Sequence, residues 1–407
     1  MKGRNCKMII GLIGKANVGK STFFNAATEL SVPAANYPFT TISPNVGIAF
    51  ARRKCVCREF GVQDNPVHSM CVDGNRFIPI KLVDVAGLVP GAHLGKGLGN
   101  KFLDDARQAD ALIHVVDASG STDSNGKPVP AGSSSPVDDV KFVEEEFDLW
   151  LASIVGRDWS KTAREAEGTS QTLELMLAKR LSGLAISEQQ IVTALDSSGL
   201  VGKKPTFWTE TDIRSFCSIL RKEAKPFLVA ANKADMPFAA PNIEKLRGLA
   251  NEVIPCSSEA EVMLKKASKK SILHYLPGDG SFDIRPGVQL NDQQKRVLDL
   301  VRDLLQKYGS TGVQESINYA CFKLLKLIAV YPVEDEFRLS DKKGNVLPDV
   351  RLLVPGSTAE DLAMTVHADL AKRFLFAIDA KTKKRIGAEH VLQDGDVIKI
   401  VSAASGG

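Results

Sequence analysis

The sequence lacks the features of a membrane protein or a secreted protein. Its 407 residues contain no apolar run long enough to cross a bilayer. Its seven cysteines are an odd number spread over a long chain, which is not the framework of a disulfide-rich secreted domain. The apolar stretch Met8–Ile13 follows basic residues but runs directly into a glycine-bounded loop, so we interpret it as a buried strand and not as a signal peptide. We therefore expect a cytoplasmic protein with no membrane partner.

The chain also lacks a strong excess of charge of one sign. The formal net charge is +4, and 25% of the residues are charged. This balance permits contact with nucleic acid but does not argue for it. An apolar fraction of 44% is ordinary for a globular protein, and the length suffices for two or three domains. We find no internal repeat.

A glycine-bounded loop follows the first expected strand. Residues 14–22 have the spacing G-x-x-x-x-G-K-S and precede an expected helix at Lys20–Leu30. Main-chain N–H groups at the start of such a helix converge on phosphate oxygens. Lys20 would reach the β- and γ-phosphates, and Ser21 would offer its hydroxyl to Mg²⁺. The residues predicted to contact the nucleotide here are Asn17, Val18, Gly19, Lys20, Ser21 and Thr22.

Two further segments fit the phosphate end of the same site. Asp84-Val85-Ala86-Gly87 follows an expected buried strand and fits D-x-x-G. Asp84 would hold a Mg²⁺-bound water, and the Gly87 N–H would bind the γ-phosphate. A loop at residues 36–45, between the two motifs, would supply a threonine that completes the metal shell and senses the γ-phosphate. Thr41 is our choice for this threonine, and Thr40 is the second choice.

A short motif about two hundred residues later predicts which base is bound. Residues 232–235 read N-K-A-D and directly follow a buried strand. Asp235 can accept hydrogen bonds from N1–H and the exocyclic amine of guanine, whereas adenine has no matching donors. Asn232 would buttress the loop, the Lys233 stem would cover the base, and Ser257 with Ser258 would supply main-chain contacts to O6. The motifs together favour GTP over ATP.

The alternation of strands and helices predicts an α/β fold of the P-loop NTPase type. Apolar strands, each followed by a polar loop, indicate a mostly parallel sheet covered on both faces. Ser119–Pro136 is rich in Ser, Gly and Pro, and we expect a flexible connector there. The predicted division is a nucleotide-binding (G) domain at 1–137, a helical insertion at 138–224, the second part of the G domain with connecting helices at 225–326, and an α+β module at 327–403.

These motifs resemble those of the Obg-like translation-factor GTPases. Within them the chain resembles the YchF-related branch, particularly its archaeal-type GTP-binding members, over essentially its whole length. The tail, with Gly356-Ser357-Thr358 and Asp394-Gly395-Asp396-Val397, resembles a TGS (ubiquitin-like) domain. YchF proteins proper have a degraded guanine motif and accept ATP, whereas residues 232–235 are intact here. The resemblance implies hydrolysis of GTP to GDP by a switch that acts on the ribosome or on RNA.

The group that would drive hydrolysis is left open. Leu88 stands where Ras-type enzymes place a glutamine that orients water. The resemblance implies that His93 takes over this role, together with Lys20 and Gly87 in the catalytic set. A second candidate is K⁺, because Asn17 occupies the position that coordinates this ion in similar GTPases. A K⁺ ion would supply the charge that an arginine finger otherwise brings.

Partners and rival functions follow from weaker signals. A basic run at Lys381–Arg385 suits RNA phosphates, so we expect rRNA or tRNA contact with little reading of sequence. A monomer is favoured. The first alternative is a ribosome- or RNA-binding scaffold that holds nucleotide without turnover. The second is an ATPase, as in YchF proper.

One cluster has the look of a metal site. Cys55-Val56-Cys57 is followed by His68 and Cys71, and such a set could close around Zn²⁺. The spacing is irregular, so reduced thiols in a strand pair and its loop are the favoured interpretation. The sequence leaves both open.

Overall fold

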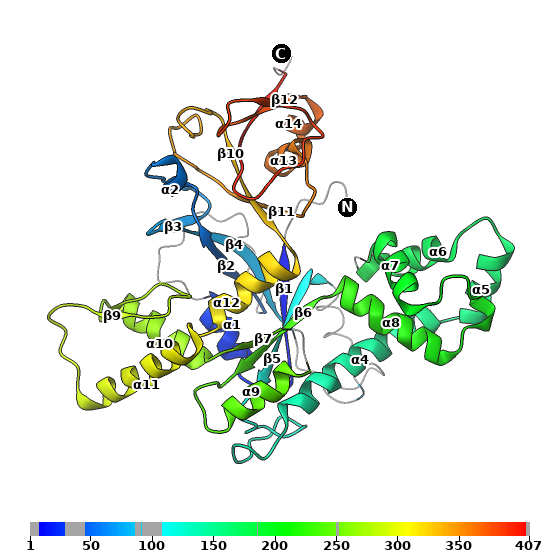
Figure 1. The fold of residues 1–407 in the computed structure, drawn as a ribbon, viewed down its shortest axis with the longest axis horizontal. Helices are drawn as coiled ribbons and strands as arrows, with labels where there is room; N and C mark the ends of the chain where they lie inside the picture. Colours follow the sequence, from blue (N-terminus) through cyan, green and yellow to red (C-terminus); the bar gives the residue numbers. More distant parts are fainter. Residues whose placement is uncertain are drawn as a thin grey trace. The chain divides into compact units, whose positions relative to one another are not determined.

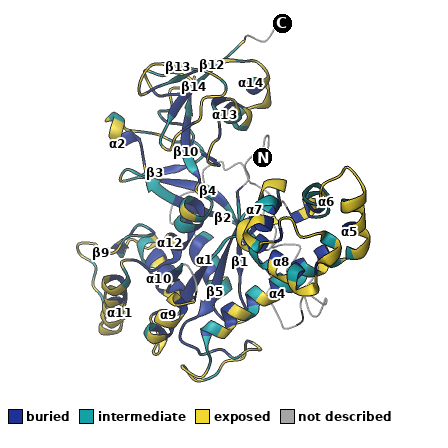
Figure 2. Cartoon of the chain, turned by 45° about the vertical axis from the view of Figure 1, so that its right-hand side comes forward, coloured by how far each residue is buried: buried dark blue, intermediate teal, exposed yellow. Residues whose placement is uncertain are grey.

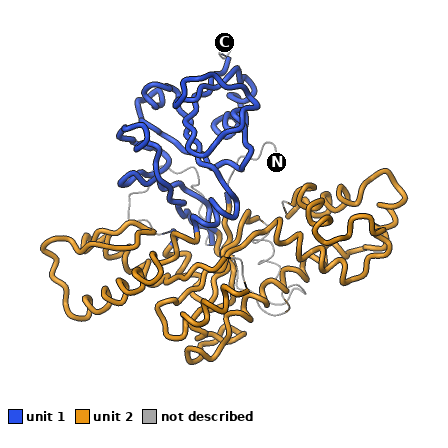
Figure 3. The backbone as a smooth tube through the Cα atoms, in the orientation of Figure 1, with its two compact units in different colours: residues 1–8, 27–82, 317–407 blue, residues 9–26, 83–316 orange. Residues whose placement is uncertain are grey.

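The structure is a computed structural model that describes residues 8–28, 45–85, 91, 108–184, 186–249 and 252–403. The chain forms two compact units (Figure 3). Unit 1 comprises residues 1–8, 27–82 and 317–407, and unit 2 comprises residues 9–26 and 83–316. Each unit is described by itself.

Four parallel strands form the centre of unit 2. They are β1 (Ile9–Ile13), β5 (Ala111–Asp117), β6 (Phe227–Asn232) and β7 (Val253–Pro255), and they pair in that order. Every residue of β5 is buried, which explains its continuous apolar run. The register pairs Asp117 with Asn232, so the ends of β5 and β6 lie level at the carboxyl edge of the sheet. Loops that leave this edge are where open α/β sheets bind ligands.

Helices α1 (Lys20–Thr28), α9 (Ala239–Arg247) and α10 (Ser258–Lys269) each follow a strand of this sheet (Figure 1). The apolar faces of α9, α10 and α11 (Asp292–Tyr308) share one core with β6 and β7, around Val229, Ile243 and Leu304. The outer face of α11 is largely exposed (Figure 2). The remaining short elements after α10 are β8 (Leu273–His274), β9 (Asp283–Ile284), α12 (Val313–Tyr319) and the π-helix Ala320–Leu324.

A group of helices lies between β5 and β6 in the chain. They are α4 (Pro136–Gly156), α5 (Trp159–Gly168), α6 (Leu173–Arg180), α7 (Glu188–Ser198) and α8 (Glu210–Ala224). Their apolar faces form a separate core that includes Trp208 and Phe216. Ser187 and Thr209 begin α7 and α8 with capping boxes, which satisfy the first free N–H groups of each helix. The four-segment domain division stays a prediction, and the helices lie where the insertion was expected.

Unit 1 contains the strands β2 (Val46–Lys54), β3 (Met70–Val72) and β4 (Asn75–Asp84). The last two residues of β4 belong to unit 2. The short helix α2 (Cys57–Phe60) follows β2. The C-terminal module has a five-stranded sheet in the order β11-β10-β14-β12-β13. Its elements are β10 (Ile328–Val333), β11 (Arg351–Leu353), α13 (Ala359–Val366), α14 (Ala368–Lys372), β12 (Phe374–Asp379), β13 (Arg385–Ile386) and β14 (Val397–Ser402).

The predicted fold class is confirmed. In the C-terminal module α13 and α14 are two separate helices, because His367 has an extended backbone and begins α14 by accepting the Asp369 N–H. Among the described residues, no helix is both long enough and apolar enough to pass through a membrane.

Candidate nucleotide-binding site

The phosphate loop turns tightly between β1 and α1. Gly14 has φ +149°, and a Cβ there would lie 2.4 Å from the carbonyl oxygen of Val115. Gly19 has φ +91°, and a Cβ there would lie 2.2 Å from Nδ2 of Asn232. Both positions therefore require glycine for their conformation and for space. The second of these close contacts places the phosphate loop directly against the guanine motif.

Lys20 and Ser21 lie beside Asp84 of the D-x-x-G segment. The Lys20 ammonium donates to Oδ1 of Asp84, and the Ser21 hydroxyl donates to Oδ2 at 3.3 Å. The three side chains predicted to hold the γ-phosphate and Mg²⁺ thus lie together at the end of β4 and the start of α1. An incoming phosphate would compete with Asp84 for the Lys20 ammonium.

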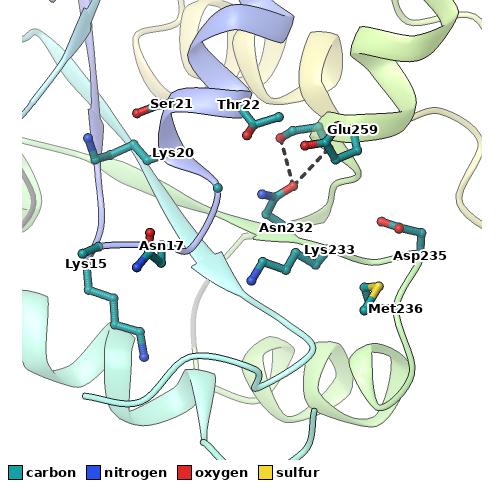
Figure 4. Close-up of a pocket in the computed structure, with 13 residues that line it drawn as sticks. Lys15, Asn17, Lys20, Ser21, Thr22, Asn232, Lys233, Asp235, Met236 and Glu259 are labelled. Carbon is teal, nitrogen blue, oxygen red and sulfur yellow. Dashed lines mark hydrogen bonds between the residues drawn. The ribbon is translucent and has the colours of Figure 1, made fainter. Parts of the chain in front are cut away.

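Asn232 joins the phosphate loop to the segment after β7 (Figure 4). Its Nδ2 donates to the carbonyl of Val18 at 2.9 Å. Its Oδ1 accepts the N–H of Ser258 at 3.0 Å and the hydroxyl of Ser258 at 2.9 Å. Only 3% of Asn232 is exposed, so all three bonds are shielded from water. This is the geometry that the predicted buttress requires.

One cavity of about 590 Å³ contains both ends of the candidate site. Lys20 and Ser21 lie at one end, and the exposed Asp235 lies at the other, beyond Asn232 and Lys233 (Figure 4). A volume of this size is typical of small-molecule sites. The sequence interpretation required these two segments to share one cavity, and they do. The cavity is lined by Lys15, Ala16, Asn17, Gly19, Lys20, Ser21, Thr22, Asn232, Lys233, Asp235, Met236, Ser258 and Glu259.

Lys233 has a partner that the sequence interpretation missed. Its ammonium donates to Oδ2 of Asp117 at 2.8 Å and to the Ser121 hydroxyl at 3.1 Å. The hydroxyls of Ser119, Ser121 and Thr122 also donate to Asp117. Burial would raise the pKa of Asp117, but the hydrogen bonds from Lys233 and the three hydroxyls outweigh it and lower the pKa. Asp117 ends β5, and a polar residue at the carboxyl end of a parallel strand is the signal that could have found it.

The segment after Asp117 is fastened to the phosphate loop. Asn17 donates from Nδ2 to the carbonyl of Gly126 at 2.7 Å. Lys15, which is 4% exposed, donates to the carbonyl of Thr122 and to Oδ1 of Asp139, each at 2.8 Å. These bonds do not fit the flexible connector expected at residues 119–136. Asn17 donates to Gly126 through its amide nitrogen, and its predicted contact with K⁺ stays a prediction.

Helix α10 fixes the two serines predicted near the base. Ser257 begins this helix, accepts the Ala260 N–H with its side chain, and is 1% exposed. The Ser257 N–H donates to the carbonyl of Thr311 at 2.9 Å, so it is not free for a base. Lys265 of the same helix is 5% exposed and donates to the carbonyl of Ala26 near the end of α1. The Lys265 ammonium is therefore buried inside unit 2 and does not belong to a solvated basic surface.

Several predicted residues lie outside the described part of the chain. They are Thr40 and Thr41 of the predicted metal shell, and Gly87, Leu88 and His93 of the hydrolysis prediction. The assignment of the second Mg²⁺ ligand and of the catalytic group therefore stays a prediction.

Three models of protein families match the chain. Residues 9–138 match the 50S ribosome-binding GTPase family. Residues 230–335 match the G4 motif-containing domain of YGR210-like Obg-like GTPases, and residues 342–402 match the TGS domain. The three matches follow the order of the phosphate loop, the guanine motif and the C-terminal module.

Individual relatives match over nearly the whole length. An uncharacterized GTP-binding protein of Methanocaldococcus jannaschii is 52% identical over 97% of this chain and 99% of its own. The ribosome-binding ATPase YchF of Bacillus subtilis is 29% identical over 95% of this chain and 97% of its own. The crystal structure of a GTP-binding protein from Pyrococcus horikoshii has 40% identity and a TM-score of 0.76, and covers 97% of this chain and all of that one.

Proposed function

Because this chain belongs to the Obg-like P-loop GTPases, in the group related to YchF, we propose that it hydrolyses GTP to GDP and phosphate as a ribosome-linked switch. The observation that carries the proposal is the shared cavity, with Lys20 and Ser21 at one end and Asp235 at the other. A triphosphate needs cationic and N–H groups at one end, and guanine needs an acceptor at the other. The cavity supplies both at one site.

The phosphate end fits a magnesium nucleotide. Ser21 Oγ and Asp84 Oδ2 lie 3.3 Å apart, so a metal ion bound by the Ser21 hydroxyl would lie near the Asp84 carboxylate. In the proposed complex Ser21 contacts Mg²⁺ directly, Asp84 does so through water, and Thr41 completes the shell. The ion would neutralise charge on the β- and γ-phosphates. Lys20 would leave Asp84 and contact the same phosphates.

The base end supports GTP over ATP. Asp235 is exposed in the cavity, and its carboxylate can accept two hydrogen bonds from guanine. Adenine would leave this carboxylate unpaired and would bring its own amine where guanine has O6. Lys233 is fixed through its ammonium on Asp117, which leaves its aliphatic stem to cover the base. The name of the B. subtilis relative keeps ATP as the rival substrate.

Direct competition decides between the two nucleotides. We expect GTP and GDP to displace a fluorescent GDP analogue at least about a hundredfold more effectively than ATP and ADP, a difference of about 3 kcal/mol. Asp235→Asn should move the preference from GTP towards XTP, since the amide can donate to the xanthine oxygen. Exposed Asp292→Asn serves as the matched control. Equal affinity for ATP and GTP, or unchanged base selectivity in Asp235→Asn, would contradict the proposed base site.

The ribosomal partner is proposed from the relatives and from the C-terminal module. The YchF proteins are named as ribosome-binding, and the family that matches residues 9–138 bears the same description. Lys381, Lys383 and Lys384 are exposed on the C-terminal module and suit rRNA or tRNA phosphates. We place this activity in the cytoplasm and favour a monomer.

Phosphate release in the presence of purified ribosomes tests the switch. We expect slow turnover by the protein alone, faster turnover with ribosomes, and faster turnover in K⁺ than in Na⁺ buffer. Lys20→Ala should abolish tight triphosphate binding, whereas Lys245→Ala, at an exposed position of α9, should not. Equal rates in both salts, with and without ribosomes, would refute the proposed activation. Nucleotide binding without any multiple-turnover release would favour the scaffold.

A further inference from the structure

Three thiols and one carboxylate converge in unit 1, and none of these four residues lines the nucleotide cavity. Cys55 follows β2, Cys57 begins α2, and Cys71 lies in β3. Asp64 comes from the segment between α2 and β3. One ligand atom from each of these four residues lies within 4.8 Å of the other three. In the part of the chain that the structure describes, no other three or more His, Cys, Asp or Glu residues converge in this way.

The structure changes the ligand set that the sequence suggested. The spacing pointed to His68 as the partner of the three cysteines. The converging group contains Asp64 in its place, and His68 is not a member. The chain between Cys57 and Cys71 therefore turns a carboxylate, and not an imidazole, towards the thiols.

The distances suit a tetrahedral ion. The sulfurs of Cys57 and Cys71 are 3.8 Å apart. The sulfur of Cys55 is 3.2 Å from Oδ2 of Asp64. Zinc binds sulfur at about 2.3 Å and oxygen at about 2.0 Å, so a tetrahedral shell places two sulfurs about 3.8 Å apart and a sulfur and an oxygen about 3.5 Å apart. Small shifts of side chains would bring all four atoms to these separations.

The electrostatics of the cluster favour a cation. Cys55 is 3% exposed and Cys57 is 6% exposed. Thiolates buried this deeply need a cation beside them, because burial away from water penalises an unpaired charge.

Arg76 supplies part of the balancing charge. It is fully buried, and its guanidinium donates to Oδ2 of Asp64 at 2.8 Å and to the Ser69 hydroxyl at 2.8 Å. Three thiolates and one carboxylate carry four negative charges, which Zn²⁺ and this arginine reduce to one. A buried arginine that hydrogen-bonds a metal ligand is the kind of outer partner that orients metal sites.

We propose that the three thiolates and the Asp64 carboxylate hold one Zn²⁺ in a closed, structural site. Four protein ligands leave no position for water or substrate, which distinguishes a structural zinc site from a catalytic one. Soft thiolates in tetrahedral geometry select zinc over magnesium or calcium. The ion fastens the segment between β2 and β3.

The segment around the proposed ion, residues 64–76, contacts the C-terminal module. The Asn65 side chain accepts the N–H of Val346, and the Val67 N–H donates to the carbonyl of Pro348 at 2.8 Å. Arg76 also donates to the carbonyl of Leu347. All these residues belong to unit 1. Loss of zinc should therefore loosen the contact between residues 64–76 and residues 346–348.

Metal analysis of the full-length protein tests the site. Protein purified under reducing conditions and dialysed against a weak chelator should retain about one Zn²⁺ per chain. Cys57→Ala and Cys71→Ala should each lower this content at least about tenfold. Cys321→Ala is the matched control, because Cys321 is a buried cysteine of the same unit outside the cluster, and it should retain the metal. Cys57→Ala and Cys71→Ala should also show faster hydrogen exchange at the amides of Val67 and Val346, which bond across this contact, and Cys321→Ala should not.

Cobalt exchange keeps the proposal testable even if a cysteine variant does not fold. Co²⁺ taken up by the unaltered protein should give a thiolate charge-transfer band and the visible bands of a tetrahedral ion. Another soft metal at the same stoichiometry, lost in the same variants, would support the site. The proposal is overturned if fully reduced protein binds less than about a tenth of an equivalent of Zn²⁺ and gives no such cobalt spectrum. A disulfide between Cys57 and Cys71 in protein prepared under reducing conditions would also overturn it.

Discussion

Asn232→Ala should uncouple the phosphate loop from the guanine motif. The asparagine makes three hydrogen bonds, to the Val18 carbonyl and to the N–H and hydroxyl of Ser258. Val18 is fully buried and Ser258 is 2% exposed, so water reaches neither group in the folded protein. Alanine would leave one acceptor and two donors without their partner.

The expected magnitude follows from these contacts. A buried polar group without a partner costs about 1–3 kcal/mol. The Ser258 hydroxyl can rotate to another acceptor, so two main-chain groups carry most of the loss, about 2–6 kcal/mol in total. If about 2–3 kcal/mol of this loss falls on the binding free energy, because GDP must then order the site, the affinity for GDP falls about 30- to 150-fold.

Titration with a fluorescent GDP analogue measures this loss. Asn242→Ala is the matched control, because Asn242 of α9 is also buried and donates one hydrogen bond, to the carbonyl of Ala118 at 2.9 Å. We expect Asn242→Ala to lower the free energy of unfolding by about 1 kcal/mol and to leave GDP affinity within about threefold. A change of less than threefold in Asn232→Ala, or an equal loss in both variants, would refute the reasoning.

Three further predictions concern single side chains of unit 2. Gly19→Ala should weaken GDP binding, because the new Cβ would lie 2.2 Å from the Asn232 side chain. In the Asn232→Ala background that side chain is gone, so the added loss of affinity from Gly19→Ala should be smaller. Purely additive losses in the binding titration would contradict this. His114 is fully buried, and burial lowers its pKa to about 3. Between pH 6.5 and pH 3 the imidazole therefore binds a proton in the unfolded chain but not in the folded chain. The free energy of unfolding consequently falls as the pH falls from 6.5 towards 3. His114→Phe should remove about 2 kcal/mol of the difference in unfolding free energy between pH 7.5 and 5, measured in urea, whereas exposed His274→Gln should not; an unchanged pH slope in His114→Phe would refute it. Lys15→Met should destabilise unit 2 by about 3 kcal/mol at pH 7.5, because it leaves the buried Asp139 carboxylate without its cation. The loss of stability should be smaller at pH 5. A loss that does not depend on pH in urea unfolding would count against the ion pair.

The positions of the motifs were predictable because each follows a buried strand. Gly14, Asp84 and Asn232 come directly after or at the end of apolar runs, and parallel strands bring such ends to one edge of a sheet. This rule suffices to place Lys20 and Asp235 around one cavity. It needs only local pattern and the order of elements along the chain.

The contacts that fasten the site were not predictable in the same way. Lys233 and Asp117 are separated by 116 residues, and nothing in either local sequence specifies their pairing. The segment around Gly126 has the composition of a flexible loop, yet its carbonyl accepts a bond from Asn17, 109 residues away. At the cysteine cluster, spacing identified the thiols but could not tell whether His68 or Asp64 turns inward. Such choices depend on tertiary packing, which local composition does not encode.

The segment between Asp117 and α4 has a consequence for regulation. Its Gly126 carbonyl accepts from Asn17 of the phosphate loop, and its Ser121 hydroxyl accepts from Lys233 of the guanine motif. The segment continues without a break into α4, the first helix of the inserted group. A partner that tilts α4 would therefore strain the phosphate loop and the guanine motif at the same time. Thermodynamic reciprocity then requires that whatever factor the partner imposes on nucleotide affinity, the nucleotide imposes on partner affinity. The segment between Asp117 and α4, although rich in serine, glycine and proline, would in this way couple the binding of a partner at α4 to the binding of the nucleotide.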